Sequence, residues 1–378
     1  MKKDLLDVCD YLKKLVIPHT PDDFIIAEPF KHGLANDELF QGIASFRTFL
    51  YELFDKIATD KNTFDIPKGK VFDIESGNYS IRDCFPIFND IAVVLFSLGI
   101  YGTLKTEPRN ELIVCGNDLF TPFISGKPSA MKKINRKRQR ELFNYLSDMG
   151  FYFEDLNIDN EIDFSKTGTF YVTCENDDNT ILGLKLISEA LGNVKAGFLK
   201  LASIFMRCDF YPLANETPKD HAATAGEYAN PQQPKIKDWI INTEKQLIKS
   251  GCKISCFSLS NTNGDGSFTY NSRKGKKICS FGMSICGCNI AIQADNLMDE
   301  VNILPELPED MLTFIKKRVE KGVCKEGKHK CKYKDHLQFT LNGETHTMCR
   351  WGGLNFVLND ESDCGLFSKW INLELSRV

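Results

Sequence analysis

A polar, proline-rich stretch in the middle of the chain is the feature that most limits how it can fold. Four prolines lie between Tyr211 and Lys237, at positions 212, 218, 231 and 234, among many small polar residues. Proline lacks an N–H and its ring clashes with the preceding helical turn, so such a stretch holds neither a continuous helix nor a central strand. The sequence therefore predicts a linker over residues 211–236 between a first domain, 1–210, and a second, 237–378.

The length and composition are those of a globular protein with two cores. A chain of 378 residues is long for one compact core, and hydrophobic and charged residues make up 42% and 26% of it. These shares are typical of folded chains and argue against disorder over most of the length. A net charge of -4 gives no support to wholesale binding of nucleic acid or of a membrane surface, although local patches remain to be considered.

The apolar segments are too short to predict a membrane span. The longest apolar run, Ile91–Phe96, has six residues, whereas roughly 18 are needed to cross a bilayer. The amino-terminal residues show a helical stripe of Leu5, Cys9, Leu12 and Val16 rather than a secretion signal. We therefore expect a cytoplasmic protein without a membrane partner, whose 14 cysteines are mostly buried, reduced thiols.

The first domain shows two similar helix–strand segments. A helix ending near Gly99 leads to a strand at 111–115, and a helix ending near Gly150 leads to a strand at 170–174. In each copy we expect the glycine to end the helix in the left-handed conformation and a Cys-x-Asn-Asp turn to close the strand. The likeness predicts a weak internal helix–strand repeat, and chance similarity of two generic units is the alternative.

The second domain is predicted to contain a helix followed by many strands. The helix is expected at 237–250. Strands are expected at 253–259, 267–271, 276–281, 289–293, 337–341, 344–349 and 354–358, with a further helix at about 308–321. Consecutive strands with helices before and between them are typical of an antiparallel sheet with flanking helices. The sequence thus predicts an α+β protein.

Cysteine and histidine gather near the carboxyl end of the chain. Between Cys324 and Cys364 lie four cysteines and three of the six histidines. Thiolate and imidazole groups are ligands that zinc favours. Their spacing contains no Cys-x2-Cys pair and matches no standard zinc motif, so strand geometry has to decide which of them can meet.

A hairpin signal at residues 342–343, Asn-Gly, predicts the geometry of this region. A two-residue turn there pairs Leu341 with Glu344 and Phe339 with His346. Further expected pairs are Leu337 with Met348 and His336 with Cys349. Because side chains alternate along a strand, His346 is expected on the apolar face and Cys349 on the polar face.

Three interpretations of the remaining pair, His336 and Cys349, stay open. A zinc site would need Cys324 and Cys331 to join them, which gives a complete set of four ligands. A catalytic thiol would use His336 as the base for Cys349. The sequence favours the third interpretation, a polar strand face with an incidental cysteine, because no carboxylate is placed to orient His336.

The strongest run of positive charge lies at the start of a predicted helix, with no acid between Lys127 and Arg140. Its members are Lys132, Lys133, Arg136, Lys137, Arg138 and Arg140. Positive charge at a helix amino end opposes the helix dipole, so helix stability does not explain it, whereas contact with phosphates of a nucleic acid would. The alternative, which the sequence favours, is a solvated surface neutralised in part by acids between Glu154 and Asp163.

The chain contains none of the common motifs for phosphate loops, dinucleotide binding, zinc proteases or serine hydrolases. The sequence therefore favours a non-enzymatic ligand-binding or interaction protein, whose ligand or protein partner it does not name. Two alternatives remain: a nucleic-acid-associated regulator that uses residues 132–140, and a zinc- or cysteine-dependent enzyme centred on His336 and Cys349.

Overall fold

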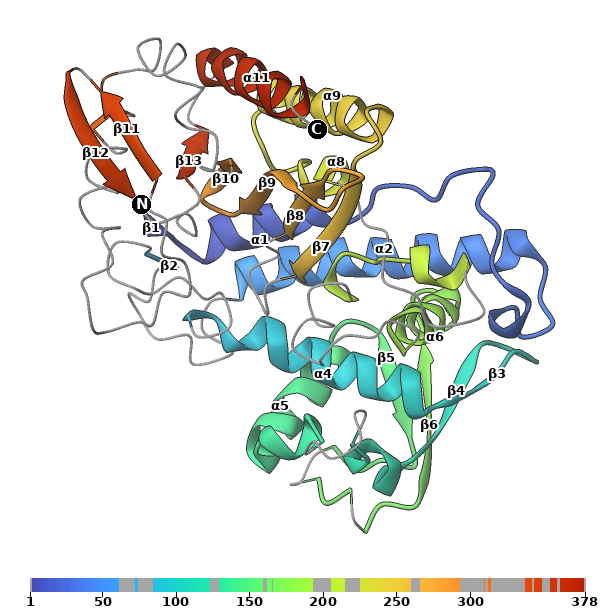
Figure 1. Ribbon diagram of the computed structural model, residues 1–378. Helices are drawn as coiled ribbons and strands as arrows, with labels where there is room; N and C mark the ends of the chain where they lie inside the picture. The colour runs from blue at the N-terminus through green and yellow to red at the C-terminus, as the bar shows by residue number, and fades with distance from the viewer. Residues whose placement is uncertain are drawn as a thin grey trace. The chain divides into compact units, whose positions relative to one another are not determined.

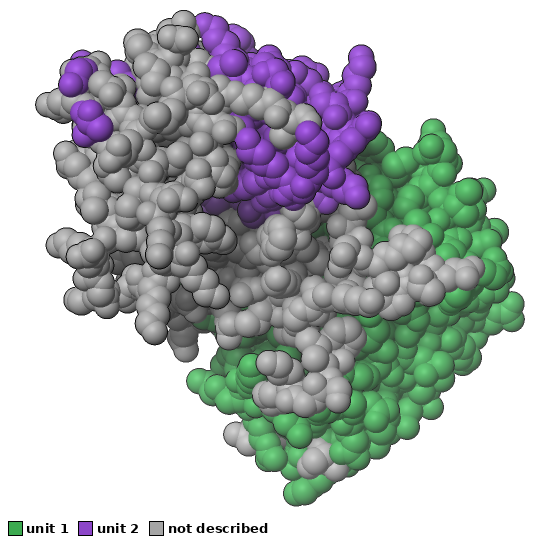
Figure 2. Space-filling view, viewed as in Figure 1, with its two compact units in different colours: residues 1–223, 259–264 green, residues 224–258, 265–378 purple. Residues whose placement is uncertain are grey.

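The chain has an α+β fold that divides into two compact units. The computed structural model describes residues 2–60, 72–73, 84–122, 129–158, 162–164, 166–192, 205–214, 225–259, 266–292, 309, 312–313, 337–341, 343–348, 354–358 and 361–376. Unit 1 contains residues 1–223 and 259–264, and unit 2 contains residues 224–258 and 265–378; Figure 2 distinguishes them by colour. Each unit has its own antiparallel sheet (Figure 1).

Unit 1 combines long helices with a four-stranded sheet. Its helices are α1 (Leu5–Leu15), α2 (Asn36–Thr59), α4 (Pro86–Tyr101), α5 (Arg136–Ser147) and α6 (Asn179–Gly192), with short 3-10 turns η1 (Glu28–Phe30), η2 (Gly116–Phe120), η3 (Met131–Lys133) and η4 (Tyr211–Ala214). Its strands are β3 (Thr103–Lys105), β4 (Glu111–Cys115), β5 (Phe151–Glu154) and β6 (Thr169–Cys174), in the order β3-β4-β6-β5. A separate short pair joins β1 (Lys2–Lys3) to β2 (Phe72–Asp73).

Helix α6 is the centre of this unit and packs against both α2 and α4 (Figure 1). The crossing with α2 is made by two glycines: a Cβ atom on Gly183 would lie 2.0 Å from the carbonyl oxygen of Gly42. The crossing with α4 is as close, because a Cβ on Gly99 would lie 2.1 Å from Oγ of Ser188. Small residues at both crossings let the helices approach more closely than larger side chains allow.

The predicted helix stops are right at one glycine and wrong at the other. Gly150 has φ +94° and follows α5, as a left-handed stop requires. Gly99 lies inside α4, which continues to Tyr101 and is closed by the N–H of Gly102 on the carbonyl of Leu98. The contact between α4 and α6 requires the glycine at position 99, and this contact cannot be read from the local sequence.

The two predicted helix–strand segments meet in the sheet. The strands predicted at 111–115 and 170–174 are confirmed as β4 and β6, which pair antiparallel through Leu112 with Val172 and Val114 with Phe170. Each follows a helix and a first strand, α4 and β3 in one case and α5 and β5 in the other. A duplicated unit would produce this order, and the duplication itself stays a prediction.

Unit 2 consists of a five-stranded sheet, a separate hairpin and helices. Its sheet has the order β13-β10-β9-β8-β7, from β7 (Lys253–Leu259), β8 (Gly266–Asn271), β9 (Lys277–Ser284), β10 (Gly287–Ile292) and β13 (Leu354–Leu358). Helices are α8 (Ala225–Tyr228), α9 (Pro234–Lys249) and α11 (Glu361–Ser376), and the hairpin joins β11 (Leu337–Leu341) to β12 (Glu344–Met348). Helices α9 and α11 lie together, joined by a hydrogen bond of 2.8 Å from the Trp239 indole to the Ser368 hydroxyl.

The expectation that residues 211–236 hold no helix is wrong in part. Helix α8 and the 3-10 turn η4 both lie in this stretch, and α9 begins at Pro234, three residues before the predicted start. A proline in the first helical turn loses no hydrogen bond, since the N–H there has no partner inside the helix. Pro234, which was expected to exclude a helix, therefore marks the beginning of α9.

The strands of unit 2 largely follow the prediction. The hairpin register is confirmed, with Leu341 opposite Glu344 and Phe339 opposite His346. The predicted pair of Leu337 with Met348 is also present. Most of the helix predicted at about 308–321 lies outside the described residues, and α11 is a helix that no sequence signal predicted. Among the helices of the described ranges, none combines the length and apolarity that a membrane crossing requires.

Candidate functional site

The predicted zinc or thiol site belongs to a part of the chain outside the described residues. Cys324, Cys331, His336 and Cys349 all lie outside the described residues. Within the part of the chain that the structure describes, no three His, Cys, Asp or Glu side chains are grouped so that they could hold a metal ion. Both interpretations of this cluster stay predictions.

The basic run lies on η3 and at the start of α5. Lys132 and Lys133 are exposed on η3, and α5 begins at Arg136 after Asn135, whose side chain accepts a hydrogen bond of 2.9 Å from the N–H of Arg138. A polar cap of this kind fixes where the helix starts. Four of the six basic residues therefore lie in the first turns of α5.

Half of these cations are already paired with acids. Arg136 lies 3.2 Å from Asp163, which belongs to the acidic stretch expected to neutralise the run, and Arg138 lies 3.3 Å from Asp90. Lys137 lies 3.7 Å from Glu141. In the described ranges, Lys132, Lys133 and Arg140 form no ion pair, so three cations remain available to an external anion.

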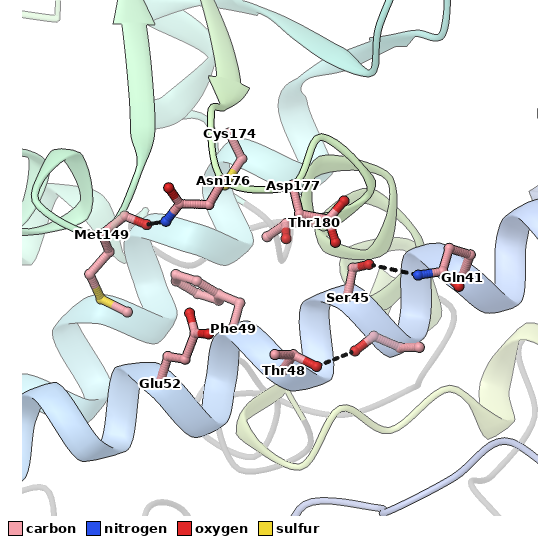
Figure 3. A pocket seen from close by; sticks show the side chains of 11 residues that line it. Gln41, Ser45, Thr48, Phe49, Glu52, Met149, Cys174, Asn176, Asp177 and Thr180 are labelled. Carbon is pink, nitrogen blue, oxygen red and sulfur yellow. Dashed lines mark hydrogen bonds between the residues drawn. The ribbon is translucent and has the colours of Figure 1, made fainter.

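A pocket of about 240 Å³ lies elsewhere in unit 1, between α2 and the turn that joins β6 to α6 (Figure 3). The α2 wall carries four polar side chains, Gln41, Ser45, Thr48 and Glu52. Their spacing of four, three and four residues places them on one face of a helix. This stripe is a signal that the sequence offered and that the interpretation of the motifs missed.

The α2 wall is ordered by contacts within the helix. The Gln41 amide donates a hydrogen bond of 3.4 Å to the hydroxyl of Ser45, which is only 5% exposed, and the Thr48 hydroxyl donates to the carbonyl of Ala44. Glu52, at the other end of the stripe, is exposed. The pocket therefore has a buried hydroxyl on its floor and a solvated carboxylate at its edge.

The opposite wall is the turn after β6, the Cys-Glu-Asn-Asp sequence predicted to close that strand. The Asn176 amide donates a hydrogen bond of 3.2 Å to the carbonyl of Met149, and the N–H of Glu175 donates one of 2.8 Å to the carbonyl of Gly150. A Cβ on Gly150 would lie 2.5 Å from Nδ2 of Asn176. Glycine at position 150 thus makes room for the side chain that holds the turn in place.

Asp177 connects this turn to α6. One of its carboxylate oxygens accepts from the N–H of Asn179 at 3.0 Å and from the Asn179 side-chain amide at 3.2 Å. A carboxylate at this position satisfies an N–H at the helix start, which has no partner inside the helix. Asp177 therefore has a structural role besides its place in the pocket wall.

Cys174, beside the turn, is a buried thiol. Burial raises the pKa of its thiol, and hydrogen bonds from the backbone N–H groups of Asp177 and Asn176 and from Thr180 only partly oppose this effect. The nucleophilic form of cysteine is the thiolate. Burial therefore disfavours the thiolate form of Cys174.

The charge of the pocket is negative. Glu52 and Asp177 are its two carboxylates, and none of the described residues that line it is basic. The Phe49 ring forms part of the lining (Figure 3). Carboxylates and an aromatic ring attract a cation, and hydroxyl and amide groups hydrogen-bond a polar ligand.

Comparison of the chain with protein-family models, curated proteins and solved structures gives no significant match.

Proposed function

We propose that this chain is a non-enzymatic binding protein for a small, positively charged polar ligand, held in the pocket between α2 and the β6–α6 turn. The observation that carries the proposal is the lining itself: two carboxylates, Glu52 and Asp177, three hydroxyl groups and two amides, with no basic residue among them. An ammonium group offers donors only and matches such a lining, whereas an anion would be repelled.

The volume sets the size of the ligand. A pocket of about 240 Å³ has room for roughly eight water-sized groups at about 30 Å³ each. A short aliphatic amine or diamine fits this volume, with its carbon chain against Phe49 and Met149 and its ammonium groups toward the carboxylates. Binding without reaction is proposed because burial raises the pKa of the Cys174 thiol and so disfavours the thiolate that a nucleophile requires.

A reducing compartment is part of the proposal. The ten cysteines whose side chains the structure describes are all free thiols, and free thiols in this number are typical of the cytoplasm. The cytoplasmic location expected from the sequence is retained on this basis.

A matched pair of probes tests the charge preference directly. Purified protein is titrated with 1,4-diaminobutane and with 1,4-butanediol, which has the same chain length and no charge, and binding is followed by calorimetry and by the melting temperature. At 100 times the dissociation constant, the diamine should stabilise the protein by about 2.7 kcal/mol, whereas the diol should leave it unchanged. Equal responses to both probes, or none to either, would refute the proposal.

A variant pair assigns the effect to the pocket. Glu52 lines the pocket and forms no hydrogen bond or ion pair with another described residue. E52Q should therefore weaken diamine binding about tenfold, or roughly 1.4 kcal/mol, without loss of stability. Glu175 is exposed on the adjoining turn but does not line the pocket. E175Q is therefore the control and should bind as the unmodified protein does.

A further inference from the structure

Arg47 is a buried cation in the middle of α2 that has no acidic partner among the residues the structure describes. It is 9% exposed, and its guanidinium makes one hydrogen bond, of 3.2 Å from Nη2 to the Thr20 hydroxyl. Its Nε is buried and has no hydrogen-bond acceptor. Two residues along a helix turn through about 200°, so Arg47 lies on the side of α2 away from Ser45 and the pocket.

An arginine in this state is costly to the folded protein. Removing a charge from water is unfavourable unless a counter-ion and hydrogen bonds replace the lost hydration. The same unit shows the usual solution: Arg207, which is 1% exposed, lies 3.3 Å from the carboxylate of Asp209. Arg47 has no carboxylate within ion-pair distance in the described ranges. A contribution to the stability of the fold therefore does not explain why an arginine occupies this position.

The two described acidic side chains that interact with Arg47, Tyr51 and Cys208, offer it no negative charge at neutral pH. Tyr51 lies one turn further along α2; burial raises the pKa of its hydroxyl, against the opposing effects of Arg47 and Lys13. Cys208 is fully buried, and burial raises the pKa of its thiol to about 12 although Arg47 lowers it. Both groups are neutral at pH 7. Lys13, the other cation near Tyr51, is already paired with Asp55 at 2.7 Å.

Thr20 is carried by a segment that is fixed at both ends. The N–H of Ile17 donates a hydrogen bond of 2.9 Å to the carbonyl of Arg207, and the N–H of Ala27 donates one of 2.9 Å to the carbonyl of Leu213. Residues 18–23, between these anchors, are exposed or half-buried, and Ile25 is 68% exposed, whereas Ile26 is fully buried. Movement of this segment between its anchors would open the buried side of the guanidinium.

We propose that Arg47 and Thr20 form a binding site for an oxyanion, the phosphate or carboxylate group of a small ligand. The Nε and Nη2 donors of a guanidinium lie on one edge and match the two oxygens of such a group. The Thr20 hydroxyl, which accepts from Nη2, keeps its own hydrogen for a third bond to the same group. This site is separate from the amine pocket and does not depend on it.

The test uses inorganic phosphate and acetate, each compared with chloride at equal ionic strength. Either oxyanion should raise the melting temperature of the protein by at least about 2–4 °C at saturation, and a response to one of them alone identifies the class of group. R47M should lose this response, and R47K, which keeps the charge without the fork of donors, should lose most of it. R109M is the control, since Arg109 is an exposed arginine of the same unit.

The stability of the variants without anion is the second measurement. R47M removes an uncompensated buried charge and should melt no lower than the unmodified protein, which a purely structural arginine would not allow. The proposal is overturned if neither oxyanion raises the melting temperature, or if R47M responds as strongly as R109M. It is also overturned if D22N or D23N lowers the melting temperature and no oxyanion has an effect, because the segment itself then supplies the counter-ion.

Discussion

The two sides of helix α2 carry opposite charges that the fold does not neutralise. Among the described residues, one side faces a pocket with two carboxylates and no basic side chain, and the other holds Arg47 without an acidic partner. Two other charges of this helix are paired within the fold: Asp55 lies 2.7 Å from Lys13, and Lys56 lies 3.0 Å from Asp60. The contrast directs the search for ligands to Glu52, which lines the pocket, and to Arg47, which is buried and has no ion-pair partner in the described ranges.

The largest expected effect comes from the crossing that holds α2 in place. A side chain at position 183 would collide with the Gly42 carbonyl, so G183A should cost about 3 kcal/mol of unfolding free energy, measured with urea. The start of α6 supplies Asp177 and Thr180 to the pocket, so diamine binding should weaken as well. Gly168 has nothing within 4 Å of an added Cβ, and G168A should change stability by less than about 0.5 kcal/mol. Equal costs for the two variants would disprove the glycine contact.

The next effect concerns the turn that forms the second wall. G150A places a side chain in the left-handed region and against Asn176. It should lower the free energy of unfolding by about 2 kcal/mol, and backbone strain should account for about 1–2 kcal/mol of this loss. Gly275 has φ +79° with open space around it, so G275A measures the strain alone. G150A should also weaken diamine binding, and G275A should not. If G150A left binding intact, the position of Asn176 would have no part in the site.

A smaller effect separates the two acids of the pocket. D177A should lose diamine binding and also about 1 kcal/mol of stability, because Asp177 accepts the N–H of Asn179 at the start of α6. E52Q should lose binding with no cost in stability. Calorimetry combined with urea unfolding distinguishes the two roles. A stability loss in E52Q as large as that in D177A would mean that Glu52 is structural.

The smallest expected effect is on nucleic-acid binding. Lys132, Lys133 and Arg140 are the cations of the basic run without an acid in the described ranges, so at most about three phosphates would be contacted. The slope of log K against log salt should then be no steeper than about −3, as measured by mobility of DNA and RNA between 50 and 200 mM salt. A steeper slope that K132A/K133A/R140A removes would favour the regulator over the binding protein.

The sequence predicts local structure well and tertiary contacts poorly. The turn at residues 342–343 sets the register of its own hairpin. The strands of unit 2 are found from the residues that favour turns between them and from the alternation of apolar and polar side chains along them. Gly99 was misread because its reason is a contact with Ser188, on a different helix. The pocket joins Ser45 to Asp177, which lie far apart in the chain, so only the stripe on α2 was visible beforehand. The cysteine and histidine cluster around His336 and Cys349 stays a prediction.

The central claim is that the two sides of α2 select ligands of opposite charge, and one set of melting curves tests it most directly. The unmodified protein, E52Q and R47M are each melted with 1,4-diaminobutane, with inorganic phosphate and with neither. We expect E52Q to lose most of the response to the diamine and keep that to phosphate, and R47M to do the reverse. Responses that fall together in both variants, or that persist in both, would contradict the account.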